Sequence, residues 1–188
     1  MLPIRIAACS LLLLLAVGGC SKKAAVTPER FQELVDTPGD NVPLSHRVDI
    51  GVPLWTNAEI NLVLNYASGR VVTEKMQGTA KTIAGKYIVH TVQSELHHQP
   101  MHSIFTYDEK SGEFKEYGLF SNKVTEATLT FDTKAKTFAA KASFGTGFTE
   151  TSTGSYSDVG ESSHTVVRLN GEYFMTRDET TRPVSSGN

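Results

Sequence analysis

From about residue 46 to the C-terminal end, apolar and polar side chains alternate with a period of two. Thr, Val, Phe and Tyr, which favour pleated strands, are frequent in this region, and no long helical pattern interrupts it. Short turn segments such as Asn170-Gly171 separate the alternating runs. The pattern predicts an all-β fold, an antiparallel meander of about eight to ten strands that closes into a barrel and so leaves no exposed edge. The predicted strands are residues 59–67, 70–77, 85–96, 101–108, 114–121, 124–131, 137–144, 146–156, 164–169 and 172–180.

The turns also predict which side chains share one face of the sheet. If residues 97–100 form a loop, Val92 lies opposite Phe105, His90 opposite Tyr107 and Leu96 opposite Met101; a loop at residues 109–112 then places Phe105 opposite Glu116. Large apolar side chains would therefore gather on one face. That face would carry Ile88, His90, Val92, Leu96, Met101, Phe105, Tyr107, Phe114, Glu116 and Phe120. In the next hairpin the predicted pairs are Phe131 with Phe138, Leu129 with Ala140, and Ala127 with Ala142.

The first 20 residues predict export and lipidation. Arg5 precedes an apolar run over residues 6–17, and Val17-Gly18-Gly19-Cys20 resembles the lipobox, in which the cysteine is acylated and becomes the first mature residue. The run is too short to span a bilayer, which requires about 20 apolar residues. We therefore expect a periplasm-facing lipoprotein held to a membrane by lipid on Cys20. Ser21, in place of aspartate, favours the outer membrane over the inner one.

The sequence predicts one folded domain behind a tether. We expect a signal peptide over residues 1–19, a lipidated tether with a short helix over 20–45, a β-barrel domain over 46–183 and a disordered tail over 184–188. Thr27-Pro28-Glu29 is a typical helix start, and three apolar residues then share one face. These residues are Phe31, Leu34 and Val35. Such a helix either packs across the barrel mouth or remains unpacked.

Charge and cysteine content exclude several functions. The 18 Lys and Arg residues and 20 Asp and Glu residues nearly balance, and the one basic pair, Lys22-Lys23, adjoins the lipidation site. Nucleic acid is therefore not expected as a partner, because its phosphates require clustered basic side chains. Cys9 leaves with the signal peptide and Cys20 carries lipid, which removes a thiol nucleophile, a redox pair and a thiolate metal site. No cofactor is expected.

Several segments together resemble a known class of proteins. They are Gly85-Lys86-Tyr87-Ile88-Val89, Ile104-Phe105-Thr106-Tyr107-Asp108, Phe114-Lys115-Glu116-Tyr117, Glu172-Tyr173-Phe174-Met175-Thr176-Arg177 and Arg182-Pro183. Over roughly residues 70–183 the chain resembles a lipocalin-like (calycin-type) family of uncharacterised bacterial proteins, often secreted or lipid-anchored. The resemblance implies a barrel with an interior cavity, and it implies no particular chemistry.

Four of the six histidines lie within a short stretch, which raises the question of a metal site. The predicted register turns His90 inward and His102 outward opposite Glu95, and it leaves His97 and His98 in the loop. His97, His98 and His102 could at most form a loose site, because no fixed ligand spacing such as HExxH is present. A solvated polar loop is the favoured interpretation, and no metal is expected.

The inward-facing trio His90, Tyr107 and Glu116 offers a second candidate site. A few polar groups in an apolar interior are typical of a small-molecule pocket, although they also suit a hydrogen-bonded core network. Burial should raise the pKa of Glu116, with His90 close enough to compensate its charge. The predicted ligand-binding residues are His90, Met101, Phe105, Tyr107, Glu116 and Phe120.

No catalytic motif occurs in the sequence. There is no Gly-x-Ser-x-Gly elbow, and the hydroxyl-rich residues 149–163 fit the wet face of strands. The chain is therefore expected to be non-enzymatic and to bind a small apolar or amphiphilic ligand inside the barrel. One alternative is an envelope scaffold with a filled barrel that docks a partner protein, and a weaker one is a histidine-dependent, metal-binding hydrolase.

Overall fold

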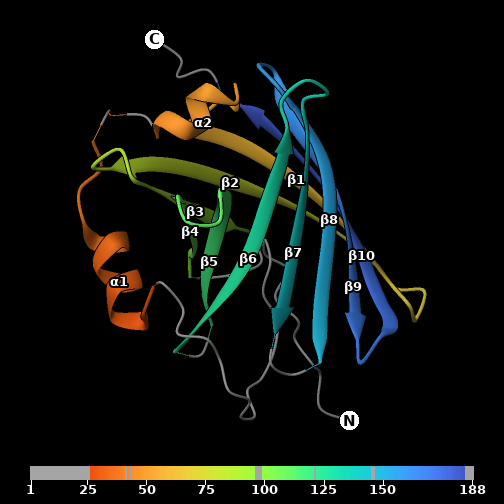
Figure 1. Cartoon of the computed structure of the whole chain (residues 1–188). Helices are drawn as coiled ribbons and strands as arrows, with labels where there is room; N and C mark the ends of the chain where they lie inside the picture. Colours follow the sequence, from red (N-terminus) through yellow and green to blue (C-terminus); the bar gives the residue numbers. More distant parts are fainter. Residues whose placement is uncertain are drawn as a thin grey trace.

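The computed structural model describes residues 26–40, 42, 44–95, 99–120, 122–144 and 147–184, with the side chains of Ser45 and Phe120 left aside. The signal peptide and Cys20 lie outside the described residues. Ten antiparallel strands form a closed barrel in which each strand pairs with its neighbours in sequence and β1 pairs with β10 (Figure 1). The strands are β1 (Asn57–Tyr66), β2 (Val71–Ile83), β3 (Tyr87–Ser94), β4 (Met101–Asp108), β5 (Glu113–Phe120), β6 (Lys123–Asp132), β7 (Thr137–Phe144), β8 (Phe148–Ser157), β9 (Gly160–Leu169) and β10 (Glu172–Pro183).

The predicted all-β meander and its closure are confirmed, and each predicted strand has a counterpart. β4 and β7 have the predicted ends, whereas β2 continues to Ile83 instead of ending at residue 77. Its inward positions in the extension include Gly78 and Ala80, which carry too little apolar side chain to mark a buried face. The alternation signal therefore stops before the strand does.

The predicted register between β3 and β4 is wrong by four positions. Val92 pairs with Met101 and Ile88 with Phe105, because β3 already ends at Ser94 and the connection to β4 is longer than the predicted loop. Four is an even number, so each side chain keeps its predicted face. His90 consequently lies opposite Ser103, not Tyr107, and His102 lies opposite Thr91, not Glu95.

The other predicted pairings are confirmed where they fall on described strands. Phe105 lies opposite Glu116, and Phe131 lies opposite Phe138 in the next hairpin. Asn170 and Gly171, the predicted turn segment between β9 and β10, have φ values of 51° and 87°, and a type I′ hairpin turn requires positive φ at both positions. The turn chemistry therefore fixes register correctly wherever the loop is short.

Helix α1 (Pro28–Asp36) packs against the outside of the barrel wall, not across its mouth (Figure 1). Thr27 caps its first turn by accepting a hydrogen bond from the backbone N–H of Arg30. Phe31 and Leu34 are each 1% exposed. They pack with outward-facing side chains of β2 to β5, namely Ile83, Val89, Ile104 and Tyr117. The Lys81 ammonium donates hydrogen bonds to the backbone carbonyls of Val35 (2.6 Å) and Thr37 (2.7 Å) at the C-terminal end of the helix.

A second helix, α2 (Ser45–Asp49), which the sequence did not predict, begins a segment that closes one end of the barrel (Figure 1). We call residues 44–55 the plug. Leu44 is buried in the barrel core, and the His46 ring stacks on Tyr107 at 3.9 Å. The Tyr156 hydroxyl donates a hydrogen bond to the Ile50 carbonyl at 3.1 Å. Neither described helix is long and apolar enough to cross a membrane.

Replacement of Leu34 by alanine tests the packing of α1 on the wall. Because the side chain is fully buried between the helix and the sheet, we expect a loss of about 2–5 kcal/mol in the free energy of unfolding, measured by urea denaturation. Gln32→Ala on the exposed face of the same helix should change that free energy by less than about 0.5 kcal/mol. Equal effects of the two substitutions would contradict the packing.

Candidate functional site: a polar cavity beneath the plug

A cavity of about 150 Å³ lies inside the barrel next to the plug. Arg47, Val52 and Trp55 of the plug line it on one side, and inward-facing side chains of the strands line the rest. The remainder of the barrel interior is filled mainly by apolar side chains of the core, among them Leu62, Leu64 and Met76, together with the buried carboxylate of Glu74. The barrel interior is therefore solid at one end and hollow at the other.

Aromatic rings form a large part of the cavity wall. They are Trp55 from the plug, Phe105 from β4, Phe131 from β6, Phe138 from β7 and Tyr156 from β8. Gly154 in β8 makes room for one of them, because a Cβ atom there would lie 2.3 Å from Cζ of Phe138. The glycine thus permits a ring at a position where any other residue would displace it.

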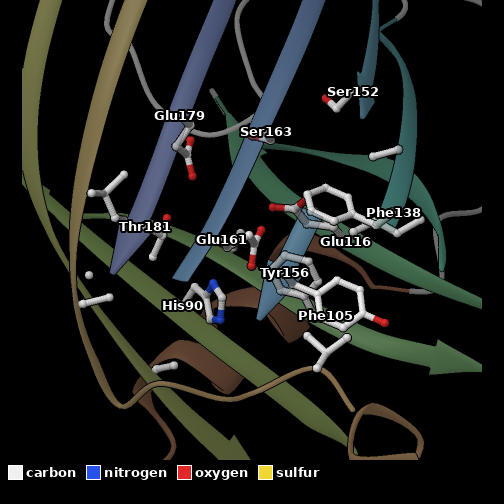
Figure 2. A pocket seen from close by; sticks show the side chains of 18 of the residues that line it. His90, Phe105, Glu116, Phe138, Ser152, Tyr156, Glu161, Ser163, Glu179 and Thr181 are labelled. Atoms are coloured by element: carbon white, nitrogen blue, oxygen red, sulfur yellow. The ribbon is translucent and has the colours of Figure 1, made fainter. Parts of the chain in front are cut away.

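Three carboxylates turn into the same space from three strands (Figure 2). Glu116 comes from β5, Glu161 from β9 and Glu179 from β10. Glu161 lies between Tyr156 and Thr181 on the neighbouring strands, and Glu179 lies opposite Ser163. The alternation of each strand, rather than a loop, directs these side chains inward.

A buried polar layer forms the floor of the cavity. Arg177 is 4% exposed and lies opposite Thr165, which in turn lies opposite Ser152. The Arg177 guanidinium donates a hydrogen bond to the Thr165 hydroxyl (3.2 Å), and the hydroxyls of Thr165 and Ser152 are 2.8 Å apart. Glu150 approaches Arg177 from one layer deeper, with 3.7 Å between Oε2 and the nearest guanidinium nitrogen. Neither Glu150 Oε2 nor Arg177 Nε makes a hydrogen bond, so this layer contains one acceptor and one donor without hydrogen-bond partners.

Burial raises the pKa of the Glu116 carboxyl to about 7. Charge repulsion from Glu179 and Glu150 acts in the same direction, whereas Arg177 and a hydrogen bond from Ser103 act against it. Burial likewise raises the pKa of Glu161 to about 7, opposed by attraction to Arg47. The pKa values of Glu150 and Glu179 are also raised by burial, with Arg177 again opposing. The positive charge of Arg177 thus opposes the rise in pKa of three carboxyl groups, those of Glu116, Glu150 and Glu179.

His90 lies in the cavity wall with its ring centroid 4.9 Å from that of Phe105. Burial, and then repulsion from Arg47, lowers its pKa to about 3, so the imidazole is neutral at physiological pH. The sequence-based expectation that His90 compensates the charge of Glu116 is therefore wrong. Arg177 is the cation that acts on this carboxylate.

The six predicted ligand-binding residues divide into three groups. His90, Phe105 and Glu116 line the cavity. Tyr107 lies beneath His46 of the plug, and Met101 packs against the apolar core, so neither reaches the cavity. Phe120 lies in β5, and its side chain is outside the description.

Sequence reasoning missed the charged residues of β8 to β10 and the contribution of the plug. Thr149, Thr151 and Thr153 do lie on the exposed face of β8, as predicted for the hydroxyl-rich stretch. Glu150 and Ser152 alternate with them and point inward, and Ser163 on β9 also lines the cavity, so the predicted wet face is wrong for these two serines. The alternation of the strand could have predicted this, because Glu150 and Ser152 lie an even number of residues from the buried Phe148 and Tyr156 and therefore point to the same face.

The histidine cluster does not converge in the described part of the chain. His102 lies on the outer face, with Nδ1 3.0 Å from the Thr91 hydroxyl, while His90 faces the interior. His97 and His98 fall outside the described residues. Among the residues that the structure describes, no group of three or more His, Cys, Asp or Glu side chains is placed to hold a metal ion.

Comparisons with known proteins support the fold alone. No family model matches the chain, and no curated protein matches it in sequence. The S-type phycobiliprotein lyase CPES from Guillardia theta superposes with a TM-score of 0.55 at 9% identity, covering 78% of this chain and 96% of that one. A protein of unknown function from the DUF3598 family of Nostoc punctiforme gives a TM-score of 0.47 at 8% identity, covering 79% and 53%. The barrel is therefore of the lipocalin-like kind.

The pH dependence of stability tests the burial of Glu116. Its pKa rises from 4.5 to about 7 on folding, so the folded state is most favoured where the group is protonated, and stability falls as pH rises through about 7. We expect Glu116→Gln to remove a decline on the order of 3 kcal/mol between about pH 4.5 and pH 7.5, measured by urea denaturation across that range.

Glu172→Gln is the matched control, since Glu172 is an exposed carboxylate on β10. This substitution should leave the slope of stability against pH as in the original protein. A Glu116→Gln protein with an unchanged slope would mean that Glu116 is solvated.

Proposed function

We propose that the protein is a membrane-anchored periplasmic lipoprotein that binds a small amphiphilic ligand inside its barrel. The observation that carries this proposal is the cavity beneath the plug, where aromatic rings and ionisable groups line one space. Ligand sites in proteins typically combine apolar walls with a few polar groups in this way. An envelope scaffold would have no use for such an interior, because its contacts lie on the outer surface.

The volume of the cavity limits the size of the ligand. Drug-sized ligands require roughly 300–1,000 Å³, whereas a dry cavity of about 150 Å³ accommodates benzene. The cavity here is about 150 Å³, so the bound group is of single-ring size unless the plug moves. A longer ligand would have to displace part of residues 44–55.

Binding, and not catalysis, is the proposed activity. The carboxylates and His90 could in principle exchange protons, but acid–base catalysis requires a positioned substrate and a reacting partner. The Guillardia theta protein that shares this fold is a phycobiliprotein lyase, and at 9% identity that likeness extends to the fold alone. Orienting a bound ligand is sufficient to explain the charged groups of the cavity.

Occupancy of the cavity can be tested with a neutral single-ring probe. Trp55 is the single tryptophan of the chain and lines the cavity, so its fluorescence reports on what enters. We expect benzyl alcohol to change the Trp55 emission of the purified full-length protein saturably and to raise its melting temperature.

Ala140→Leu should block this binding, because Ala140 faces the cavity and leucine fills part of it. Ala139→Leu places the same substitution on the outer face of β7 and should leave probe binding unchanged. Circular dichroism would verify that both proteins fold. Absence of a saturable response in the unsubstituted protein to benzyl alcohol and to other single-ring probes of its size, or an equal response in the Ala140→Leu protein, would refute the proposal.

Membrane anchoring rests on the lipobox-like segment and is tested separately. In a bacterial host the full-length chain should be found in the membrane fraction, and its mature N-terminal peptide should carry acyl groups detectable by mass spectrometry. Cys20→Ser should abolish acylation, because the thiol is the site of lipid attachment. Recovery of an unacylated protein with residues 1–19 still attached would contradict the anchor.

A further inference from the structure

The cavity contains more acidic than basic groups. Glu116, Glu161 and Glu179 line it, with Glu150 directly below, whereas the cationic side chains there are Arg47 and Arg177. His90 is neutral and adds no positive charge. If all four carboxyl groups were ionised, the two guanidiniums would leave two negative charges without a counterion.

Both arginines already have partners. Arg47 donates to the Pro53 carbonyl from Nε (3.2 Å) and from a terminal nitrogen (2.8 Å), and its charge is attracted by Glu161. Arg177 donates to Thr165 and approaches Glu150. An anionic ligand would have to compete with these contacts and would also face three carboxylates.

The carboxylates are less well compensated. Glu116 accepts a hydrogen bond from Ser103, and Glu179 accepts one from Thr181. In the described part of the chain, the Glu161 carboxylate makes no hydrogen bond and interacts with Arg47 through charge alone. Glu116 is buried and Glu161 and Glu179 are partly buried, so a positive charge beside them would stabilise their ionised forms against protonation.

We propose that the cavity selects a small organic cation, a protonated or quaternary ammonium group on a single-ring or similarly compact apolar body. This inference rests on the proposed function, since it names the chemical class of the ligand for the same cavity. The ammonium group would lie near Glu116, Glu161 and Glu179 and would supply the missing counterion. The rings of Trp55, Phe105 and Tyr156 suit the same ligand, because aromatic faces attract cations and also pack against an apolar body.

Three probes of nearly equal size separate the charge classes: benzylamine, which is protonated near neutral pH, benzyl alcohol and benzoate. Affinities of the full-length protein are measured by Trp55 fluorescence and by calorimetry. We expect benzylamine to bind at least about tenfold more tightly than benzyl alcohol, as a charge-assisted hydrogen bond in a buried site allows, and benzoate to bind most weakly. Equal binding of benzylamine and benzyl alcohol, or a preference for benzoate, would overturn the cation inference while leaving the cavity proposal intact. Failure of every probe to bind would overturn both.

Substitution of one carboxylate tests the same inference by a second route. Glu161→Gln should lower the affinity for benzylamine by about tenfold and the affinity for benzyl alcohol far less, because the amide keeps the shape of the side chain and loses its charge. Glu179→Gln serves as the second variant should the first fail to fold. Glu172→Gln on the exposed surface should leave the benzylamine affinity as it was. If the cavity variants lost affinity for both probes equally, the substituted carboxylate would have a structural role, and the inference would be overturned.

The affinity should also depend on pH in a defined direction. A cation binds the ionised carboxylates, so the benzylamine affinity should rise from about pH 6 to about pH 8, while that of benzyl alcohol should not. The groups that face these carboxylates are Arg47 from the plug, Arg177 and Glu179 from β10, Glu150 from β8, Ser103 from β4 and the neutral His90 from β3. A benzylamine affinity that is flat or falls over this range would contradict the inference.

Discussion

The pairing of β1 with β10 is the interaction on which the rest of the structure depends. Residues 58–66 align with residues 175–183 along nearly the whole of both strands, so hydrogen bonds join the two ends of the meander. Closure satisfies the backbone groups of both edge strands and encloses an interior that every strand faces with alternate side chains. The plug and the wall-bound helix α1 are additions to this closed sheet, and both precede β1 in the chain.

The enclosed interior is not uniformly apolar, and stability alone does not account for its polar half. The Arg177 layer combines a buried ion pair at 3.7 Å with Thr165 and Ser152, and two of its polar atoms remain without hydrogen bonds. Replacing such a pair by apolar residues of similar volume is often neutral or stabilising. Elsewhere in the same interior one more carboxylate is buried, that of Glu74, which lies opposite Leu62 and accepts a hydrogen bond from Ser94 away from the cavity. Arg177, Thr165 and Ser152 differ from Glu74 in that they line the cavity, which favours a role of this layer in binding.

The sequence alone predicts the sheet, but it does not predict most of the charged residues of the cavity, and the physical reason differs between residues. Alternation and turn chemistry predict the meander, and short loops fix the register, as at Phe105 and Glu116. The predicted β3–β4 register is wrong because β3 ends at Ser94, two residues before the start of the predicted loop over residues 97–100. His90, Phe105 and Glu116 were found because apolar neighbours marked their face. Glu150, Glu161, Arg177 and Glu179 were missed because charged residues on a strand are ordinarily solvent-facing, and only the closure of the barrel turns them inward.

The plug links the closed end of the barrel to the charged wall of the cavity. Arg47 hydrogen-bonds within the plug to Pro53 and at the same time attracts Glu161 on the cavity wall. Tyr156, the neighbour of Glu161 across the strands, holds the Ile50 carbonyl with its hydroxyl. The segment that closes the barrel is thus bonded to Tyr156 and attracted by the charge of its neighbour Glu161. A change in the ionisation or occupancy of Glu161 would alter its attraction to Arg47 as well as the cavity, which couples the closure of this end of the barrel to what the cavity contains.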